Sequence, residues 1–243
     1  MRKNFFQASH TFIEQEKYFC IAGFQLQKTI LYSFFHYIAF MHAPYRYFVL
    51  HKPYGMESQF ISPHAGPLLG DLNFSFPAGT HAIGRLDKYS EGLLLLTTNK
   101  KITALLFEGP VPHKRTYLVQ VKHKVSEASL AKLQSGVSIR ITGDLHYTTP
   151  PCEVHIVEPS QFPSPRAIPA YVENTWLSIT ITEGKFRQVR KMVSAIRHRC
   201  MRLIRTSIED MELGDLQPGE VKEVDQSFFF SQLKLDTSSN VKS

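Results

Sequence analysis

The chain has 243 residues, of which 43% are hydrophobic and 20% are charged. These proportions describe a globular protein with a sizeable core and exclude a disordered or fibrous chain. The formal net charge of +7 favours a polyanionic partner, although charge by itself does not identify one.

The three cysteines lie far apart in the sequence, and the 11 histidines show no metal-ligand spacing. We therefore expect free thiols in a reducing cytoplasm, no metal site and no cofactor that depends on one.

An apolar, aromatic segment at residues 30–41 is the unusual part of the chain. It is too short to span a bilayer, and it lacks the basic start and cleavage site of a secretory leader. It could be a helix packed on the domain, a weak interfacial anchor, or an upstream region outside the translated protein, which we favour. We expect no membrane association and assign residues 1–44 to an extension of doubtful structure.

Alternating and continuous apolar runs predict the elements of the remaining chain. In chain order these are strands at 47–50 and 93–97, a helix at 100–107, a strand at 116–121, a helix capped by Ser126 and running to 134, strands at 153–157 and 177–182, a helix at 189–196 and a strand at 203–208. Because there is no regular strand–helix repeat, we expect an α+β fold with a mixed sheet instead of a doubly wound one.

The most informative segment, residues 84–99, reads Gly-Arg-Leu-Asp-Lys-Tyr-Ser-Glu-Gly-Leu-Leu-Leu-Leu-Thr-Thr-Asn. Arg85 and Asp87 lie between glycines that permit a tight backbone path, ahead of an apolar run typical of a buried strand. A carboxylate in a loop against a rigid strand is well placed for chemistry, although an isolated Asp in a loop is usually a turn former.

Basic residues are concentrated between residues 184 and 208, which hold eight Lys or Arg and no Asp or Glu. Val189, Met192, Val193 and Ile196 form one apolar stripe of a helix. Arg190 is offset from Val189 by about 100° around that helix, so it should lie beside the core. A solvated basic face is the alternative interpretation of the cluster.

Residues 84–97 closely resemble the active-site loop of pseudouridine synthases, in particular the RsuA/RluE branch. Residues 114–119 (Lys-Arg-Thr-Tyr-Leu-Val) and 183–192 (Glu-Gly-Lys-Phe-Arg-Gln-Val-Arg-Lys-Met) are similar to two further motifs of the family, with Arg115 where Lys is usual. The resemblance covers roughly residues 45–225.

The resemblance implies the pseudouridine synthase fold, a mixed and mainly antiparallel sheet with flanking helices and a catalytic cleft. It implies a catalytic domain at 45–228, followed by a tail at 229–243. The implied catalytic residues are Asp87, Tyr117 and Arg190, and the implied RNA-binding residues are Arg85, Lys52, Arg115, Arg187 and Lys191, with Arg197 and Arg202 as further phosphate contacts.

The implied reaction isomerises a uridine of ribosomal RNA to its C-glycoside. No atoms enter or leave, so neither a cofactor nor an energy source is needed. Asp87 would act as a nucleophile or as a base towards the ribose, and the two roles stay open. The target uridine would leave its stack to reach the pocket.

The absence of a small amino-terminal RNA-binding domain, and the residues around 166–169 and 176–177, resemble the RluE members most. This implies large-subunit ribosomal RNA as the partner of a monomeric enzyme.

Two other function classes compete. A catalytically silent RNA-binding protein on this fold is disfavoured because Asp87, Tyr117 and Arg190 occur together. A phosphoryl transferase with an aspartyl nucleophile would require further acids as Mg²⁺ ligands, and Glu91 alone lies near Asp87 in the sequence.

Overall fold

The computed structural model describes residues 45–107, 109, 111–158, 162, 169 and 171–235. The expectations for residues 1–44 and 236–243, and the similarity at 166–168, lie outside these described residues. Within them, no helix combines the length and the apolar character that crossing a membrane requires.

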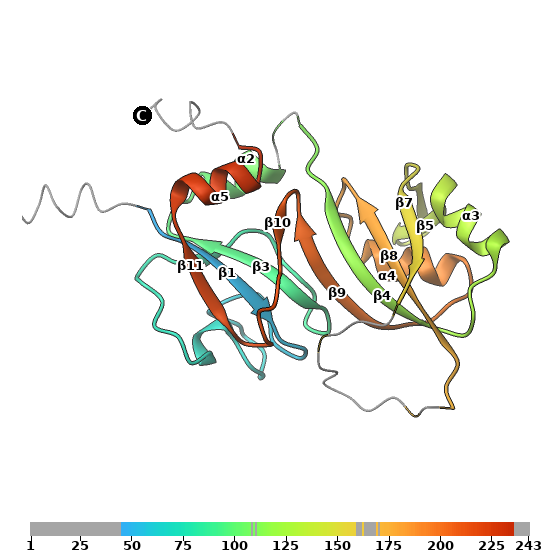
Figure 1. The fold of residues 1–243 in the computed structure, drawn as a ribbon, viewed down its shortest axis with the longest axis horizontal. Coiled ribbons are helices and arrows are strands. Elements are labelled where there is room, and N and C mark those ends of the chain that lie inside the picture. Colours follow the sequence, from blue (N-terminus) through green and yellow to red (C-terminus); the bar gives the residue numbers. More distant parts are fainter. Residues whose placement is uncertain are drawn as a thin grey trace, which may run out of the picture. The chain divides into compact units, whose positions relative to one another are not determined.

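A single mixed sheet forms the centre of the described fold (Figure 1). Its strand order is β11 (Val221–Val224), β1 (Tyr47–Lys52), β3 (Glu91–Thr97), β9 (Cys200–Ile208), β4 (Arg115–Lys122), β8 (Asn174–Ile181) and β7 (Glu153–Val157). The short strands β2 (His81–Ala82) and β10 (Met211–Glu212) extend β3 and β9. Every pairing is antiparallel except that of β3 with β9, so the predicted α+β, mainly antiparallel sheet is confirmed.

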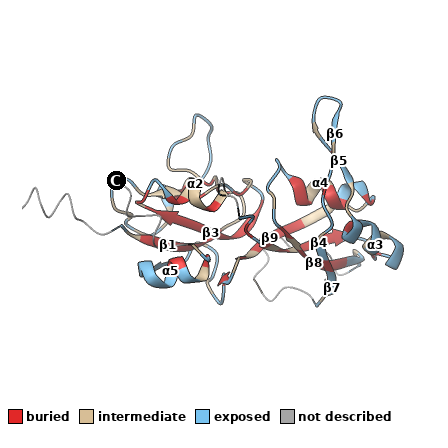
Figure 2. Cartoon of the chain, turned by 90° about the horizontal axis from the view of Figure 1, so that it is seen from above, coloured by how far each residue is buried: buried red, intermediate tan, exposed pale blue. Residues whose placement is uncertain are grey.

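Helices cover both faces of the sheet. They are α2 (Ile102–Phe107), α3 (Glu127–Ser135), α4 (Gln188–Ala195) and α5 (Gln226–Gln232), with a short 3-10 turn at Leu69–Asp71. A separate hairpin, β5 (Ser138–Thr142) with β6 (Leu145–Thr148), projects beside α4 (Figure 2).

The alternation along the strands divides the core into two clusters. On β1, Phe48 and Leu50 join the cluster that holds the apolar stripe of α4, while Tyr47 and Val49 join the cluster that holds α2 and α5. Strand β3 divides its leucines in the same way, which explains its uninterrupted apolar run: both of its faces are buried (Figure 2).

The longer strands and helices of the described chain agree with the predicted ones. The hairpin β5–β6, strand β11 and helix α5 were not predicted, nor were the short strands β2 and β10 and the 3-10 turn. The expected domain boundary at residue 228 is wrong, because it falls inside α5, whose Phe229 and Phe230 are buried against Tyr47. The packed domain therefore continues beyond that boundary.

The parallel contact between β3 and β9 joins the two halves of the sheet. Its register covers Glu91–Ile204 and Gly92–Arg205. Gly92 has a φ of +99°, and a Cβ built on it would lie 2.2 Å from the carbonyl oxygen of Arg205. No side chain fits at this position without moving one strand.

Side chains of the same two strands close this junction. Arg202 donates from Nε and Nη2 to the two carboxylate oxygens of Glu91, at 2.9 and 2.8 Å, and both side chains are buried. Arg205 Nε donates to the Leu93 carbonyl at 2.8 Å. Arg202 is therefore a structural residue, and the expectation that it neutralises phosphates is wrong.

Replacing Gly92 with Ala should destabilise the fold by roughly 2–5 kcal/mol, because the new Cβ combines a disfavoured φ with a backbone clash. Gly214→Ala is the matched control: Gly214 also has a positive φ, of +60°, but nothing lies within 4 Å of its Cβ position. The control should lose about 1–2 kcal/mol. Equal losses for the two variants in urea unfolding would contradict a close contact at this junction.

Candidate active site

The loop that carries Asp87 is fixed to its surroundings by backbone contacts. The Ser58 hydroxyl donates to the Leu86 carbonyl at 2.9 Å and accepts from the Leu86 N–H at 3.0 Å. Gly55 N–H donates to the Lys88 carbonyl, and Ser90 N–H to the Asp87 carbonyl. The position of Asp87 is therefore fixed by the loop that carries it, shortly before β3.

Lys52 supports this loop from inside the protein. Its side chain is fully buried, and Nζ donates to the carbonyls of Pro53, Met56 and Lys88 at 2.9, 2.7 and 3.3 Å. Burial lowers the pKa of Lys52 to about 7, although nearby Glu91 and Asp87 favour its charged form. The expectation that Lys52 contacts RNA is wrong, because its amino group has no access to solvent.

Two guanidinium groups from the start of α4 face the Asp87 carboxylate. Arg190 Nε lies 3.7 Å and Arg187 Nη1 3.8 Å from Asp87 Oδ2. Both distances exceed a normal hydrogen bond, so the two cations face the carboxylate without hydrogen bonding to its oxygen atoms. Two of the implied catalytic residues, Asp87 and Arg190, therefore form an ion pair, and Arg187, expected to bind RNA, contacts the carboxylate as well.

The backbone around α4 sets these positions. Arg187, the N-terminal cap of the helix, has left-handed φ and ψ of +54° and +33°, which turns the chain into the helix. Arg190 Nη2 donates to the Tyr89 carbonyl at 2.6 Å and to the Ser90 hydroxyl at 3.2 Å. Arg190 therefore ties the second half of the sheet to the Asp87 loop of the first.

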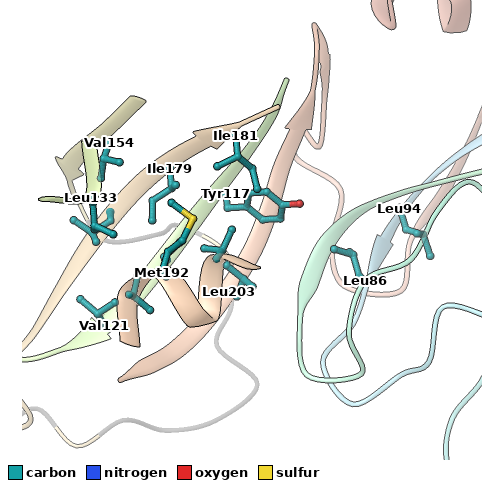
Figure 3. Packing of buried hydrophobic residues seen from close by; sticks show 14 of the residues in the cluster. Leu86, Leu94, Tyr117, Val121, Leu133, Val154, Ile179, Ile181, Met192 and Leu203 are labelled. Atoms are coloured by element: carbon teal, nitrogen blue, oxygen red, sulfur yellow. The ribbon is translucent and has the colours of Figure 1, made fainter. Parts of the chain in front are cut away.

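A pocket of about 380 Å³ opens beside the carboxylate. Side chains on one sheet face line it: Ile181 pairs with Arg115, Tyr117 pairs with Arg205, and Arg115 precedes Tyr117 by two residues on β4. Figure 3 shows Tyr117 beside Ile181 and Leu203, with its hydroxyl directed away from Ile179 and Met192 and towards the side where Leu86 lies.

The structure brings Asp87, Arg85, Tyr117, Arg115 and Arg187 together as lining residues of this pocket. Arg85 is exposed, whereas Arg115 is buried and its guanidinium lies 4.7 Å from the Phe107 ring centre.

Lys191 and Arg197, which were also expected to bind RNA, lie outside the pocket. Lys191 Nζ lies 5.3 Å from the centre of the exposed Phe186 ring. Exposed Arg197 lines a separate shallow groove together with Arg187, Arg190 and Arg199.

Arg205 lines the pocket although it was not predicted as a site residue. It lies on an apolar strand, two residues after Leu203, and the side chains of both positions line the pocket. An arginine on the inward face of a predicted strand was the available signal, because a buried cation requires a reason.

The described residues contain no group of three or more His, Cys, Asp or Glu that could hold a metal ion.

Comparison with known proteins decides the family. The family model for RNA pseudouridylate synthase matches residues 46–195. The chain belongs to the RNA pseudouridine synthase family. The fold and the enzyme class that the sequence motifs implied are thereby confirmed.

Individual relatives of this synthase agree. It is 38% identical over 179 residues to "Ribosomal large subunit pseudouridine synthase E" of Vibrio vulnificus, a match that covers 72% of this chain and 74% of the relative. The protein of the same name from Xanthomonas axonopodis pv. citri is 36% identical over 174 residues, or 70% of this chain and 89% of the relative. A solved structure, "Crystal structure of pseudouridylate synthase", superposes with a TM-score of 0.62 at 27% identity, over 78% of this chain and 74% of that chain.

The buried Lys52 predicts a pH dependence of the synthase's stability. Its pKa is about 7 in the folded chain and near 10.5 when exposed, so above pH 7 the unfolded chain holds a proton that the folded chain has lost. The contribution of Lys52 to stability should therefore rise with pH, by up to about 1.4 kcal/mol per unit up to pH 10.

Urea unfolding of wild type and Lys52→Met at pH 7.5, 8.5 and 9.5 measures this contribution, because titrations common to both proteins cancel in their difference. The free energy of unfolding of the wild type should increase relative to that of the variant as the pH rises. Lys122→Met, at an exposed position, is the control and should show no such trend. A difference for Lys52→Met that stays constant with pH would contradict a pKa near 7 for the buried amine.

Proposed function

We propose that this synthase converts a uridine of large-subunit ribosomal RNA to pseudouridine, with Asp87 as the catalytic carboxylate. The substrate class is supported by the names of its relatives from Vibrio and Xanthomonas. The observation that carries the catalytic assignment is the contact of one pocket carboxylate with two guanidinium groups, from Arg187 and Arg190.

The charge arrangement suits a carboxylate that must react while ionised. Burial by itself favours the neutral form of an acid, whereas an adjacent cation favours the anion. Asp87 is 22% exposed and Arg190 13% exposed at the side chain, so their attraction is only partly screened. The carboxylate can then act as a nucleophile or as a base towards the ribose.

Tyr117 supplies the flat surface for the uracil ring. Its side chain is 8% exposed and lines the same pocket as Asp87. We assign it to packing against uracil and, through its hydroxyl, to removal of a proton in the last step.

The surface around the pocket suits an RNA strand with one base turned out. Arg85 is exposed at the start of the Asp87 loop, and we assign it to the space that the flipped uridine leaves. Arg187, Lys191 and Arg197 then contact phosphates, which gives salt-sensitive binding with little sequence information.

Loss of the carboxylate charge should abolish the reaction. In a strain that lacks the gene, complementation with wild type should restore one missing pseudouridine in ribosomal RNA, whereas Asp87→Asn should lower its formation by roughly 10³-fold or more. Arg190→Ala should lower it by about 10²-fold, because the anion loses its closest cation.

Asp215→Asn is the matched control, since Asp215 is exposed and lies outside the pocket. Pseudouridine mapping measures all of these variants. Full activity of Asp87→Asn would refute Asp87 as the catalytic carboxylate, and full activity of Arg190→Ala would refute the proposed ion pair.

A further inference from the structure

Two buried arginines of the pocket carry unused hydrogen-bond donors. Arg115 is 7% exposed and Arg205 3% exposed. Arg115 Nε and Arg205 Nη2 are buried and have no hydrogen-bond partner among the described residues. Burying a charged donor without a partner is costly, so such groups indicate a bound ligand or a functional site.

Both arginines belong to the pocket floor. Arg205 pairs in register with Tyr117, and Arg115 lies two residues before Tyr117 on the same strand, so the three side chains share one sheet face. All three line the pocket that Asp87 also lines.

The positive charges of Arg115 and Arg205 also repel each other. Burial lowers the pKa of Arg115 from its ordinary value, and Arg205 lowers it further, against the opposing effects of Tyr117 and Glu209. The Asp87 carboxylate is already in contact with Arg187 and Arg190. The floor therefore holds positive charge that an incoming anion would compensate.

The reaction itself produces such an anion. When the bond between C1′ of the ribose and N1 of uracil breaks, its electron pair leaves with N1. This holds whether Asp87 bonds to C1′ or takes a proton from the ribose. The detached uracil therefore carries one negative charge, spread over N1 and the oxygens O2 and O4. After the ring turns, C5 bonds to C1′, the C5 proton is lost and N1 gains a proton, so that no atoms are added or lost overall.

We propose that Arg115 and Arg205 form an anion subsite that holds the oxygens of the detached uracil while it turns. The inference rests on the proposed function and adds the residues that stabilise its intermediate. The phosphates of the RNA would find partners in exposed Arg187 and Arg197 and in partly buried Lys191, whereas a planar base can enter a pocket lined by Tyr117.

Ligand binding to the full-length protein without RNA tests the subsite. The probes are uracil, which is neutral at pH 7, 5-nitrouracil, which is a ring anion at pH 7, and inorganic phosphate. We expect 5-nitrouracil to bind at least about 10-fold more tightly than uracil, because donors of this kind act on the charged form. Phosphate should not displace it.

Arg205→Met and Arg115→Met should each remove the preference for the anionic ring. The control Arg46→Met removes a guanidinium that pairs with Glu223 at the surface, and it should keep the preference. A general structural defect would weaken the binding of uracil and of 5-nitrouracil alike. If the ratio of the two affinities stays unchanged in these variants, the proposal is overturned. Displacement by phosphate at equal concentration would assign the subsite to the RNA backbone and would overturn it as well.

Turnover provides a second measurement. Because the interaction forms as the bond breaks, Arg115→Met should lower kcat by about 10²-fold with KM nearly unchanged. A rise in KM at constant kcat would contradict the subsite.

If wild type binds the anionic ring selectively but forms no pseudouridine, the proposed function fails while the subsite stands. Pseudouridine formation without anion selectivity would remove the subsite and leave the function intact.

Discussion

The parallel contact between β3 and β9 is the constraint on which the site depends. Asp87 precedes β3 in one half of the sheet, whereas Tyr117, Arg187 and Arg190 come from the other half. This junction holds the two halves in register through Gly92, which lets the backbones approach, and through the buried Glu91–Arg202 pair. A buried pair that loses one partner costs several kcal/mol, so the junction is sensitive to single substitutions.

The basic residues in and around the pocket have different roles. Arg190 and Arg187 lie within 4 Å of the Asp87 carboxylate without hydrogen bonding to its oxygens. Lys52 is buried beneath the Asp87 loop, where its amino group donates hydrogen bonds to three carbonyls. Arg115 and Arg205 remain with spare donors at the floor. The high positive charge of the chain is thus partly a property of its active site and not only of an RNA-binding surface.

The sequence predicted the strands and helices with strong apolar patterns, because burial on one or both faces imposes that pattern. It did not predict the hairpin β5–β6 or helix α5, since an exposed hairpin and a helix of seven residues carry little periodicity. For the site, the motifs named Asp87, Tyr117 and Arg190; Asp87 and Tyr117 line one pocket, and Arg190 contacts Asp87 from beside it. The motifs could not distinguish exposed cations from buried ones, so Lys52 and Arg202 were both interpreted as RNA contacts. Lys52 instead donates to a carbonyl 36 positions away, and Arg202 to a carboxylate 111 positions away.

The rate per folded molecule of Glu91→Gln tests the central role of the junction most directly, with Glu153→Gln, from an exposed ion pair, as the control. Urea unfolding gives the folded fraction, and pseudouridine formation gives the rate. If the junction positions Asp87 against Arg190, Glu91→Gln should lose at least about 10-fold in rate even after correction for unfolding, because small displacements of reacting groups are costly. A corrected rate equal to that of wild type and of Glu153→Gln would show that the site forms independently of this junction.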